Sequence, residues 1–280
     1  MRILVTGANG YIGRYVVKEL LDKGQEVYAA DVRYDEVDAR AVRVDADIFG
    51  EAEDLFVRLG SPDVCIHLAW RNGFVHNDMS HIDDFPKHYH FIKNMVDQGL
   101  KQIVVMGSMH EVGYHEGVVD ENTPCNPRSL YAVAKNALRQ LTFVLAEQKE
   151  ICCQWIRGYY ILGDDTKNNS IFSKITAAAR EGKKEFPFTS GKNKYDFISV
   201  QELAAQIAAV ATQTEVTGVI NCCSGHPVSL ADKVEGFIRE HNFDITLKYG
   251  AFPDRPYDSP AIWGDASKIE QIMKHDKMNA

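Results

Sequence analysis

The sequence predicts an α/β fold in which a doubly wound parallel sheet is followed by a smaller, mixed α/β C-terminal lobe. Two observations predict this class. Short apolar runs alternate with amphipathic helical patterns through the first half of the chain, as in parallel sheets whose strands are joined by helices. The first apolar run leads into glycines at the spacing G-x-x-G-x-x-G and then into a helical pattern. A ligand is therefore expected beyond the carboxyl ends of the strands.

The hydrophobic periodicity gives the elements in chain order. The predicted strands of the sheet are Ile3–Val5, Glu26–Ala30, Arg40–Val44, Val64–Leu68, Gln102–Met106 and Cys153–Tyr160. The helical patterns between them are Tyr11–Lys23, Ala52–Leu59, Phe85–Gln98 and Leu130–Gln148. Shorter helical patterns follow at Ile171–Gly182, Gln201–Thr212 and Ser229–Asn242.

The glycine-rich turn after the first strand is typical of a dinucleotide site. Gly7 allows a sharp turn, Gly10 lets a diphosphate approach the backbone, and Gly13 lets the following helix pack closely. The helix N-terminus then presents free N–H groups and a positive dipole end to an anion. Asp31 ends the second strand, where a carboxylate binds ribose hydroxyls and disfavours a 2′-phosphate. We predict NAD as the cofactor, with NADP possible because Arg33 lies nearby.

The character of the sequence changes after Gly163, where polar loops and shorter helices begin. We therefore predict a dinucleotide-binding Rossmann domain at residues 1–163, to which later segments return. Residues 164–280 are predicted to form the substrate-binding lobe.

Composition and charge exclude several classes of partner. The 280 residues are 45% hydrophobic and 25% charged, as in ordinary globular proteins. A net charge of −8 argues against nucleic acid, which needs a basic surface. No apolar run approaches the ~20 residues that span a bilayer. The first strand begins at the N-terminus and leaves no room for a signal peptide. We predict a cytoplasmic protein whose six cysteines, which form no C-x-x-C pair, are reduced.

A tyrosine and a lysine lie four residues apart in Tyr131-Ala-Val-Ala-Lys135. This spacing places both side chains on one face of a helix. An ammonium close to a phenol stabilises the phenolate and lowers the phenol pKa from its usual ~10. Such a tyrosine can move an alcohol or carbonyl proton while hydride moves on carbon. We therefore predict Tyr131 and Lys135 as catalytic residues.

Together, Thr6-Gly-x-x-Gly10-x-x-Gly13 and Tyr131-x-x-x-Lys135 resemble the extended short-chain dehydrogenase/reductase family, and within it the nucleotide-sugar epimerase/dehydratase/ketoreductase branch. The likeness runs through nearly the whole chain. It implies that the cofactor-binding residues are Gly7, Asn9, Gly10, Tyr11, Ile12, Gly13, Asp31, Arg33, Asp47, Ile48, Leu68, Ala69, Tyr131, Lys135 and Tyr159. It implies that the substrate-binding residues are Met109, His110, Glu111, Asn169 and Arg255. Trp70, which follows the fourth strand, is predicted to bind substrate as well, but it could equally pack within its loop.

The segment after the fifth strand departs from the family pattern. Family members carry Ser-Ser/Thr-x-x-Val-Tyr-Gly there, whereas this chain has Gly107-Ser-Met-His-Glu-Val-Gly-Tyr114. Met109 therefore stands where a catalytic hydroxyl is usual, and a thioether donates no hydrogen bond. Either Ser108 supplies the second hydrogen bond to the substrate oxygen, or the role is lost. We predict Ser108 as the third catalytic residue.

Two further groups of residues allow more than one interpretation. His110 and Glu111 occupy the positions of the acid/base pair of 4,6-dehydratases, but they could equally orient the loop or bind sugar hydroxyls. Histidines at positions 76, 81, 88 and 90 match no standard metal spacing. We predict no metal there, and expect the histidines to line a polar loop over the active site.

The resemblance implies an NAD(P)-dependent oxidoreductase that acts on a nucleotide-diphosphate sugar. We expect reduction of a 4-keto-6-deoxy sugar, with Tyr131 as proton donor, as in enzymes that make such sugars for surface polysaccharides. A redox-neutral 4-epimerase, a 4,6-dehydratase and a dinucleotide-responsive binding module without turnover remain alternatives. A homodimer is expected through the helical patterns Phe85–Gln98 and Leu130–Gln148.

Overall fold

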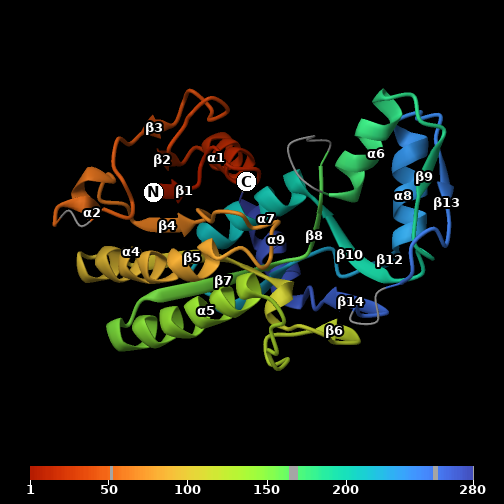
Figure 1. The fold of residues 1–280 in the computed structure, drawn as a ribbon. Coiled ribbons are helices and arrows are strands. Elements are labelled where there is room, and N and C mark those ends of the chain that lie inside the picture. The colour runs from red at the N-terminus through yellow and green to blue at the C-terminus, as the bar shows by residue number, and fades with distance from the viewer. Residues whose placement is uncertain (51–52, 164–169, 255–257, 280) are drawn as a thin grey trace.

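The computed structural model describes residues 1–50, 53–163, 170–254 and 258–279, which form two lobes side by side (Figure 1). The larger lobe holds a seven-stranded parallel sheet in the order β11-β7-β5-β4-β1-β2-β3. Its strands are β1 (Arg2–Thr6), β2 (Glu26–Ala30), β3 (Val42–Arg43), β4 (Val64–His67), β5 (Gln102–Ser108), β7 (Cys152–Gly158) and β11 (Gly218–Cys222). The predicted doubly wound parallel sheet is confirmed.

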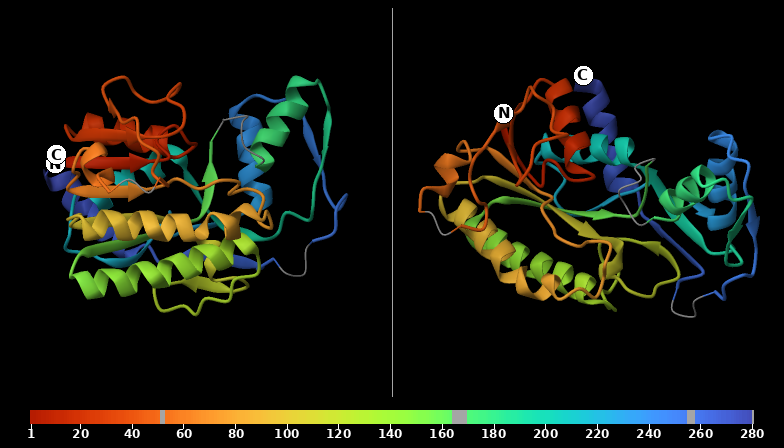
Figure 2. Two further views of the ribbon diagram at one scale, coloured as in Figure 1. Left: turned by 60° about the vertical axis from the view of Figure 1, so that its left-hand side comes forward. Right: turned by 45° about the horizontal axis from the view of Figure 1, so that its top comes forward.

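Helices cover both faces of this sheet. On one face lie α1 (Gly13–Asp22), α7 (Val200–Ala211) and α9 (Ser267–Asn279). On the other face lie α2 (Leu55–Arg58), α4 (Phe85–Asp97) and α5 (Leu130–Lys149), with the short α3 (Ser80–Asp83) leading into α4. Both views in Figure 2 show α4 and α5 side by side. The helices on the first face come from both halves of the chain, so segments beyond residue 163 pack on this sheet.

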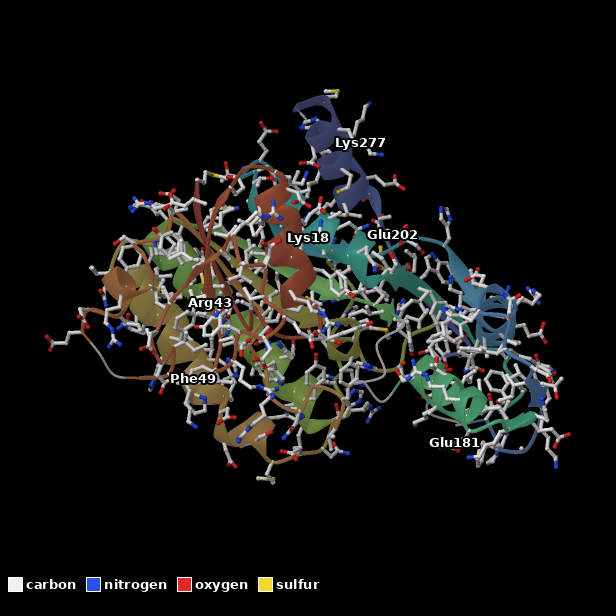
Figure 3. The ribbon with its side chains drawn as sticks, turned by 90° about the horizontal axis from the view of Figure 1, so that it is seen from above. Lys18, Arg43, Phe49, Glu181, Glu202 and Lys277 are labelled. Carbon is white, nitrogen blue, oxygen red and sulfur yellow. The ribbon has the colours of Figure 1, made fainter. Side chains whose placement is uncertain are left out.

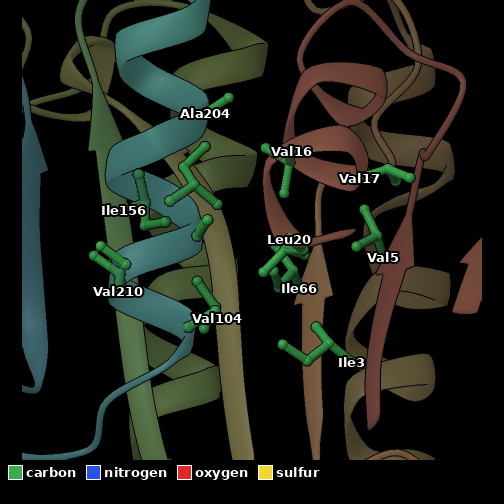
Figure 4. Close-up of a cluster of buried hydrophobic side chains, with 14 of the residues drawn as sticks. Ile3, Val5, Val16, Val17, Leu20, Ile66, Val104, Ile156, Ala204 and Val210 are labelled. Carbon is green, nitrogen blue, oxygen red and sulfur yellow. The ribbon is translucent and has the colours of Figure 1, made fainter. Parts of the chain in front are cut away.

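Alternation along the strands explains how the sheet is buried on both faces. Ile3 and Val5 of β1 pack against α1, where Leu20 is completely buried (Figure 4). Leu4 points to the opposite face and packs in the cluster that contains Met95 of α4. Full burial of one such side chain stabilises the fold by roughly 1.5–3 kcal/mol. The core of the larger lobe therefore consists of two apolar layers, one on each side of the sheet.

The smaller lobe is built on a five-stranded sheet and a separate strand pair. The five strands run β12-β10-β14-β6, with β8 paired to β10. Their bounds are β6 (Gly117–Val119), β8 (Tyr160–Leu162), β10 (Lys194–Ser199), β12 (Pro227–Ser229) and β14 (Ala261–Gly264). The pair is β9 (Glu185–Pro187) with β13 (Thr246–Lys248), and α6 (Ile171–Arg180) and α8 (Leu230–Glu240) complete the lobe. Seen from above, Lys18 and Arg43 lie on the larger lobe and Glu181 on the smaller (Figure 3).

The chain passes between the lobes at the end of β7. The sequence predicts one strand over Cys153–Tyr160, but the structure divides it at Tyr159. Residues 152–158 pair with β5 and β11 in the larger sheet, whereas β8 pairs with β10 in the smaller one. The predicted strand was too long because both halves are apolar, and periodicity does not show where a strand changes sheets. In the described part of the chain, no helix combines the length and apolar character needed to cross a membrane.

Candidate active site

A cleft of about 1950 Å³ lies at the carboxyl ends of the parallel strands and is lined by both lobes. The predicted site residues that line it are Gly7, Gly10, Tyr11, Ile12, Gly13, Asp31, Asp47, Ile48, Leu68, Ala69, Trp70, Ser108, Met109, His110, Tyr131, Lys135 and Tyr159. Asn9, Arg33 and Glu111 are not among its lining residues. Asn169 and Arg255 lie outside the described residues. The cleft occupies the place where doubly wound sheets bind ligands.

The glycine loop is too crowded for any side chain at two of its positions. Gly7 has a φ of +68°, and a Cβ there would lie 2.7 Å from the backbone nitrogen of Ala69. A Cβ on Gly13 would lie 2.0 Å from the carbonyl oxygen of Gly7. Bare backbone therefore faces the cleft where α1 begins, in the arrangement that suits a diphosphate. These residues fit a dinucleotide cofactor.

Asp31 stands at the end of β2 and orders the loop around it. Its Oδ2 accepts a hydrogen bond from the Asn9 N–H at 2.9 Å, and its Oδ1 accepts one from the Val32 N–H at 2.7 Å. The side-chain oxygen of Asn9 accepts from the Glu36 N–H at 2.8 Å. The structure thus places Asp31 in the cleft, whereas the Asn9 side chain is occupied with the neighbouring loop. A cofactor contact of Asn9 stays a prediction.

Tyr131 and Lys135 lie one turn apart near the start of α5, as the spacing predicts. The side chain of Ser108 lies beside the Tyr131 phenol and favours its ionised form. Burial is the larger effect and raises the pKa of Tyr131 above its usual range, in contrast to the lowering expected from Lys135. At neutral pH the phenol therefore keeps its proton and can donate it.

The Lys135 side chain is almost completely buried, and its amine contacts the backbone of β5. Its Nζ donates a hydrogen bond to the Met106 carbonyl oxygen at 2.7 Å and lies 6.0 Å from the centre of the Tyr131 ring. Burial lowers the pKa of Lys135 to about 7, while the nearby Glu111 carboxylate opposes this shift. The lysine can therefore change its charge in the physiological pH range.

The segment after β5 separates Ser108 from Met109. Ser108 is the last residue of β5 and its side chain lies beside the Tyr131 phenol, whereas Met109 begins a single 3₁₀ turn, η1 (Met109–Glu111). Met109 also packs in the apolar core of the smaller lobe with Tyr159 and Ile262. Of the two neighbours, Ser108 is therefore the one that carries a hydroxyl beside the tyrosine.

Glu111 is completely buried behind the strand, which corrects its predicted contact with substrate. Its Oε1 accepts hydrogen bonds from the Ser108 N–H at 2.7 Å and from Trp155 Nε1 at 3.0 Å. Its Oε2 lies 3.7 Å from Nε of Arg139 and 3.8 Å from Nη2 of Arg157. Burial raises the pKa of Glu111, and the guanidinium of Arg157 opposes the shift. The carboxylate holds the backbone of Ser108 in place, so His110 and Glu111 do not form an acid/base pair in the cleft.

A loop of residues 70–79, which we call the cover loop, lies against the start of α5. The Tyr131 N–H donates to the carbonyl oxygen of His76 at 2.9 Å, and the Leu130 N–H donates to Oδ1 of Asn77 at 3.2 Å. The first N–H groups of a helix have no partners within the helix. The cover loop therefore caps the helix that carries Tyr131 and Lys135.

His76 is a cleft residue that the sequence did not single out as substrate-binding. Its ring stacks on Tyr131 with centroids 5.3 Å apart and lies 4.5 Å from the ring of His110. The sequence signal that placed His76 near the site was its position in the loop after the fourth predicted strand. His81 and His88 are buried below the loop. Among the described residues, no group of three or more His, Cys, Asp or Glu side chains has the geometry to hold a metal ion.

A model of the NAD dependent epimerase/dehydratase family matches residues 3–223. The chain belongs to this family. The resemblance inferred from the glycine and tyrosine–lysine motifs is thereby confirmed. NAD, the predicted cofactor, is the cofactor named for the family.

Individual members of the family match over almost their full length. The dTDP-6-deoxy-L-talose 4-dehydrogenase (NAD(+)) of Aggregatibacter actinomycetemcomitans is 48% identical over 271 residues, which cover 94% of this chain and 99% of the relative. The UDP-glucose 4-epimerase of Lactobacillus helveticus is 23% identical over 313 residues, covering 100% and 94%. Among solved structures, UDP-glucose 4-epimerase from Thermotoga maritima with UDP-glucose superposes with a TM-score of 0.81 at 19% identity, covering 97% and 92%. This last likeness shows the shared fold alone.

Proposed function

We propose that the protein is an NAD-dependent oxidoreductase that interconverts the 4-keto and 4-hydroxy forms of a 6-deoxy sugar bound to a nucleotide diphosphate. The observation that carries the proposal is that one cleft brings Tyr131, Lys135 and Ser108 together with the glycine loop. The 48% identical relative, named a dTDP-6-deoxy-L-talose 4-dehydrogenase, supports a dTDP-linked sugar as substrate.

The chain's own residues would divide the work as follows. NAD(H), when bound, supplies or accepts the hydride at C4 of the sugar. In reduction, Tyr131 donates its proton to the C4 oxygen, and Ser108 donates a second hydrogen bond to that oxygen as its negative charge grows. Lys135, as an ammonium, stabilises the resulting tyrosinate. In oxidation, Tyr131 takes the proton back.

The residues proposed to hold the cofactor follow from the cleft. The glycine loop would bind the diphosphate, and Asp31 would bind the adenosine ribose. We further propose that residues 1–163, with the later segments that pack on the same sheet, bind the cofactor. The remainder of residues 164–280 would bind the sugar nucleotide. Asn169 and Arg255 stay predictions from the sequence.

The test is a coupled pair of assays on the purified protein. With dTDP-6-deoxy-L-talose and NAD we expect reduced nicotinamide to accumulate, and with the 4-keto sugar nucleotide and NADH we expect stoichiometric loss of its absorbance. Because Asp31 disfavours a 2′-phosphate, kcat/KM should be higher with NADH than with NADPH by about tenfold or more. Interconversion of two sugar nucleotides without net change in nicotinamide would instead identify an epimerase. Preference for NADPH would contradict the role given to Asp31.

We also propose a homodimer formed through α4 and α5. Helix α5 exposes apolar side chains at Val133, Leu141 and Val144, whose spacing puts them on one helix face. Exposed apolar patches of this kind mark association surfaces. Light scattering should give twice the chain mass of 31.5 kDa, and the double variant Leu141→Glu, Val144→Glu should give the mass of one chain. A wild-type protein with the mass of one chain would refute the dimer.

A further inference from the structure

We propose that Trp70 is a positioning residue for Lys135, whose ammonium it holds against the face of its indole ring. From the sequence, Trp70 could contact substrate or pack within its loop. The structure instead puts Lys135 Nζ 3.8 Å from the centre of the Trp70 ring, well within the range of a cation–π contact. The inference depends on the proposed function in one respect, namely the role that the proposed function gives Lys135 in catalysis.

The surroundings of Lys135 make the indole face important. Lys135 is only 3% exposed, and its Nζ has the Met106 carbonyl oxygen as a hydrogen-bond acceptor. The titratable groups that act on it or lie beside it are Glu111, Tyr131 and the buried His67 and His88. A buried ammonium needs compensation for its lost hydration, and the electron-rich indole face provides it in addition to the Met106 carbonyl oxygen.

Two histidines fix the indole ring in this position. His88 of α4 stacks on it with centroids 4.4 Å apart and an interplanar angle of 16°. Trp70 Nε1 donates a hydrogen bond to Nδ1 of His81 at 3.1 Å, and Nε2 of His81 donates to the Val75 carbonyl oxygen at 3.0 Å. Because the carbonyl can only accept, His81 carries its proton on Nε2, which leaves Nδ1 free to accept from Trp70. The indole therefore has little freedom to rotate away from Lys135.

His88, which stacks on the indole, is linked by hydrogen bonds to Thr6, the residue before the glycine loop. Nδ1 of His88 lies 2.9 Å from Nε2 of His67, whose Nδ1 lies 2.8 Å from the hydroxyl of Thr6. The Thr6 hydroxyl accepts from the Ala69 N–H at 3.3 Å, so its own proton is free to go to His67, and His67 can donate to His88. Burial lowers the pKa of His88 to about 3, so His88 adds no positive charge next to Lys135 at neutral pH.

The test measures the ionisation of Lys135 in Trp70→Phe and Trp70→Leu. Lys135 lines the cleft, so a trace of acetic anhydride can acetylate its neutral amine. Peptide mass spectrometry across a pH series then gives its pKa without substrate. An aromatic face favours the charged form, so Trp70→Leu should lower the pKa of Lys135 by about one pH unit, and Trp70→Phe by clearly less. Equal shifts in the two variants, or no shift in either, would overturn the proposal.

Fluorinated tryptophan provides a second test that preserves the shape of the ring. Fluorination withdraws electron density from the indole face, so wild-type protein grown with fluorotryptophan should show a lower Lys135 pKa. Trp70→Phe grown in the same way should show none of this change, because the rings that Lys135 Nζ faces in the described residues are those of Trp70 and Tyr131. An identical pKa in labelled and unlabelled wild-type protein would refute the cation–π contact even if Trp70→Leu failed to fold.

The kinetic consequence separates this inference from the proposed function. If the sugar nucleotide is turned over, the alkaline limb of kcat/KM should move to lower pH in Trp70→Leu by the same amount as the Lys135 pKa. Absence of turnover by the wild type would refute the proposed function, whereas the acetylation experiment would still decide the role of Trp70. A Lys135 pKa that falls in Trp70→Leu while the alkaline limb stays in place would overturn the positioning role.

Discussion

Replacing Tyr131 with Phe is expected to lower kcat for reduction of the 4-keto sugar by roughly 10³-fold, the middle of the range for losing a general acid. The replacement removes the hydroxyl that donates the proton and leaves the ring that stacks on His76. NADH affinity, measured by fluorescence titration, should stay within about threefold of the wild type because the glycine loop is untouched. Pre-steady-state kinetics would show the loss in the hydride-transfer step.

Tyr28→Phe is the matched control for this prediction. Its hydroxyl bonds to Glu26 on an exposed part of β2, and Tyr28 does not line the cleft. The same chemical change there should leave kcat within about twofold of the wild type. If Tyr131→Phe kept most of its activity, the general-acid role would fail and a binding module or another acid would have to be considered.

Ser108→Ala should lower kcat by roughly 10²-fold, as expected when a donor to a developing oxyanion is lost. The effect should fall on kcat more than on KM, because the hydrogen bond strengthens only as the C4 oxygen gains charge. Ser108→Thr, which keeps a hydroxyl, should recover a substantial part of the activity. Steady-state kinetics on the three proteins, with circular dichroism to check the fold, measures this series.

Met109→Leu is the decisive comparison, since family alignment places the missing hydroxyl at this position. Met109 packs in an apolar core and carries no donor, so the variant should retain kcat within about threefold. A large loss in Met109→Leu together with a small loss in Ser108→Ala would show that the hydroxyl role was not transferred to Ser108.

Local patterns explain why the sheet and the glycine loop could be predicted from the sequence. Strand β1 points alternate side chains into two apolar layers, and the glycines of the glycine loop follow directly after it. The pattern that predicts this strand and this loop therefore lies within thirteen consecutive residues. Tyr131 and Lys135 lie on one helix, where spacing alone sets their relation. The sequence predicts β7 and β8 as one strand because both parts are apolar. Which sheet each part joins depends instead on distant segments of the chain.

The misplaced residues all depend on contacts between distant parts of the chain. Glu111 turns away from the cleft because Trp155 and two arginines, one of them on β7, provide partners behind the strand. Trp70 lies against Lys135, and His88, eighteen residues later, stacks on the same indole ring. No spacing rule predicts these pairs, since each joins different elements. Such contacts can be read only from the folded chain.

The attachment of the cover loop to α5 determines how molecules can enter and leave the cleft. Lifting the loop would break the hydrogen bonds of Tyr131 and Leu130 to His76 and Asn77 and expose two helix N–H groups. It would also separate Arg71 from Asp84, which form an ion pair at 2.8 Å. Opening on this side would therefore break the contacts that hold the start of α5, the helix that carries Tyr131. We expect ligands to exchange past the smaller lobe, because that route would keep these contacts intact.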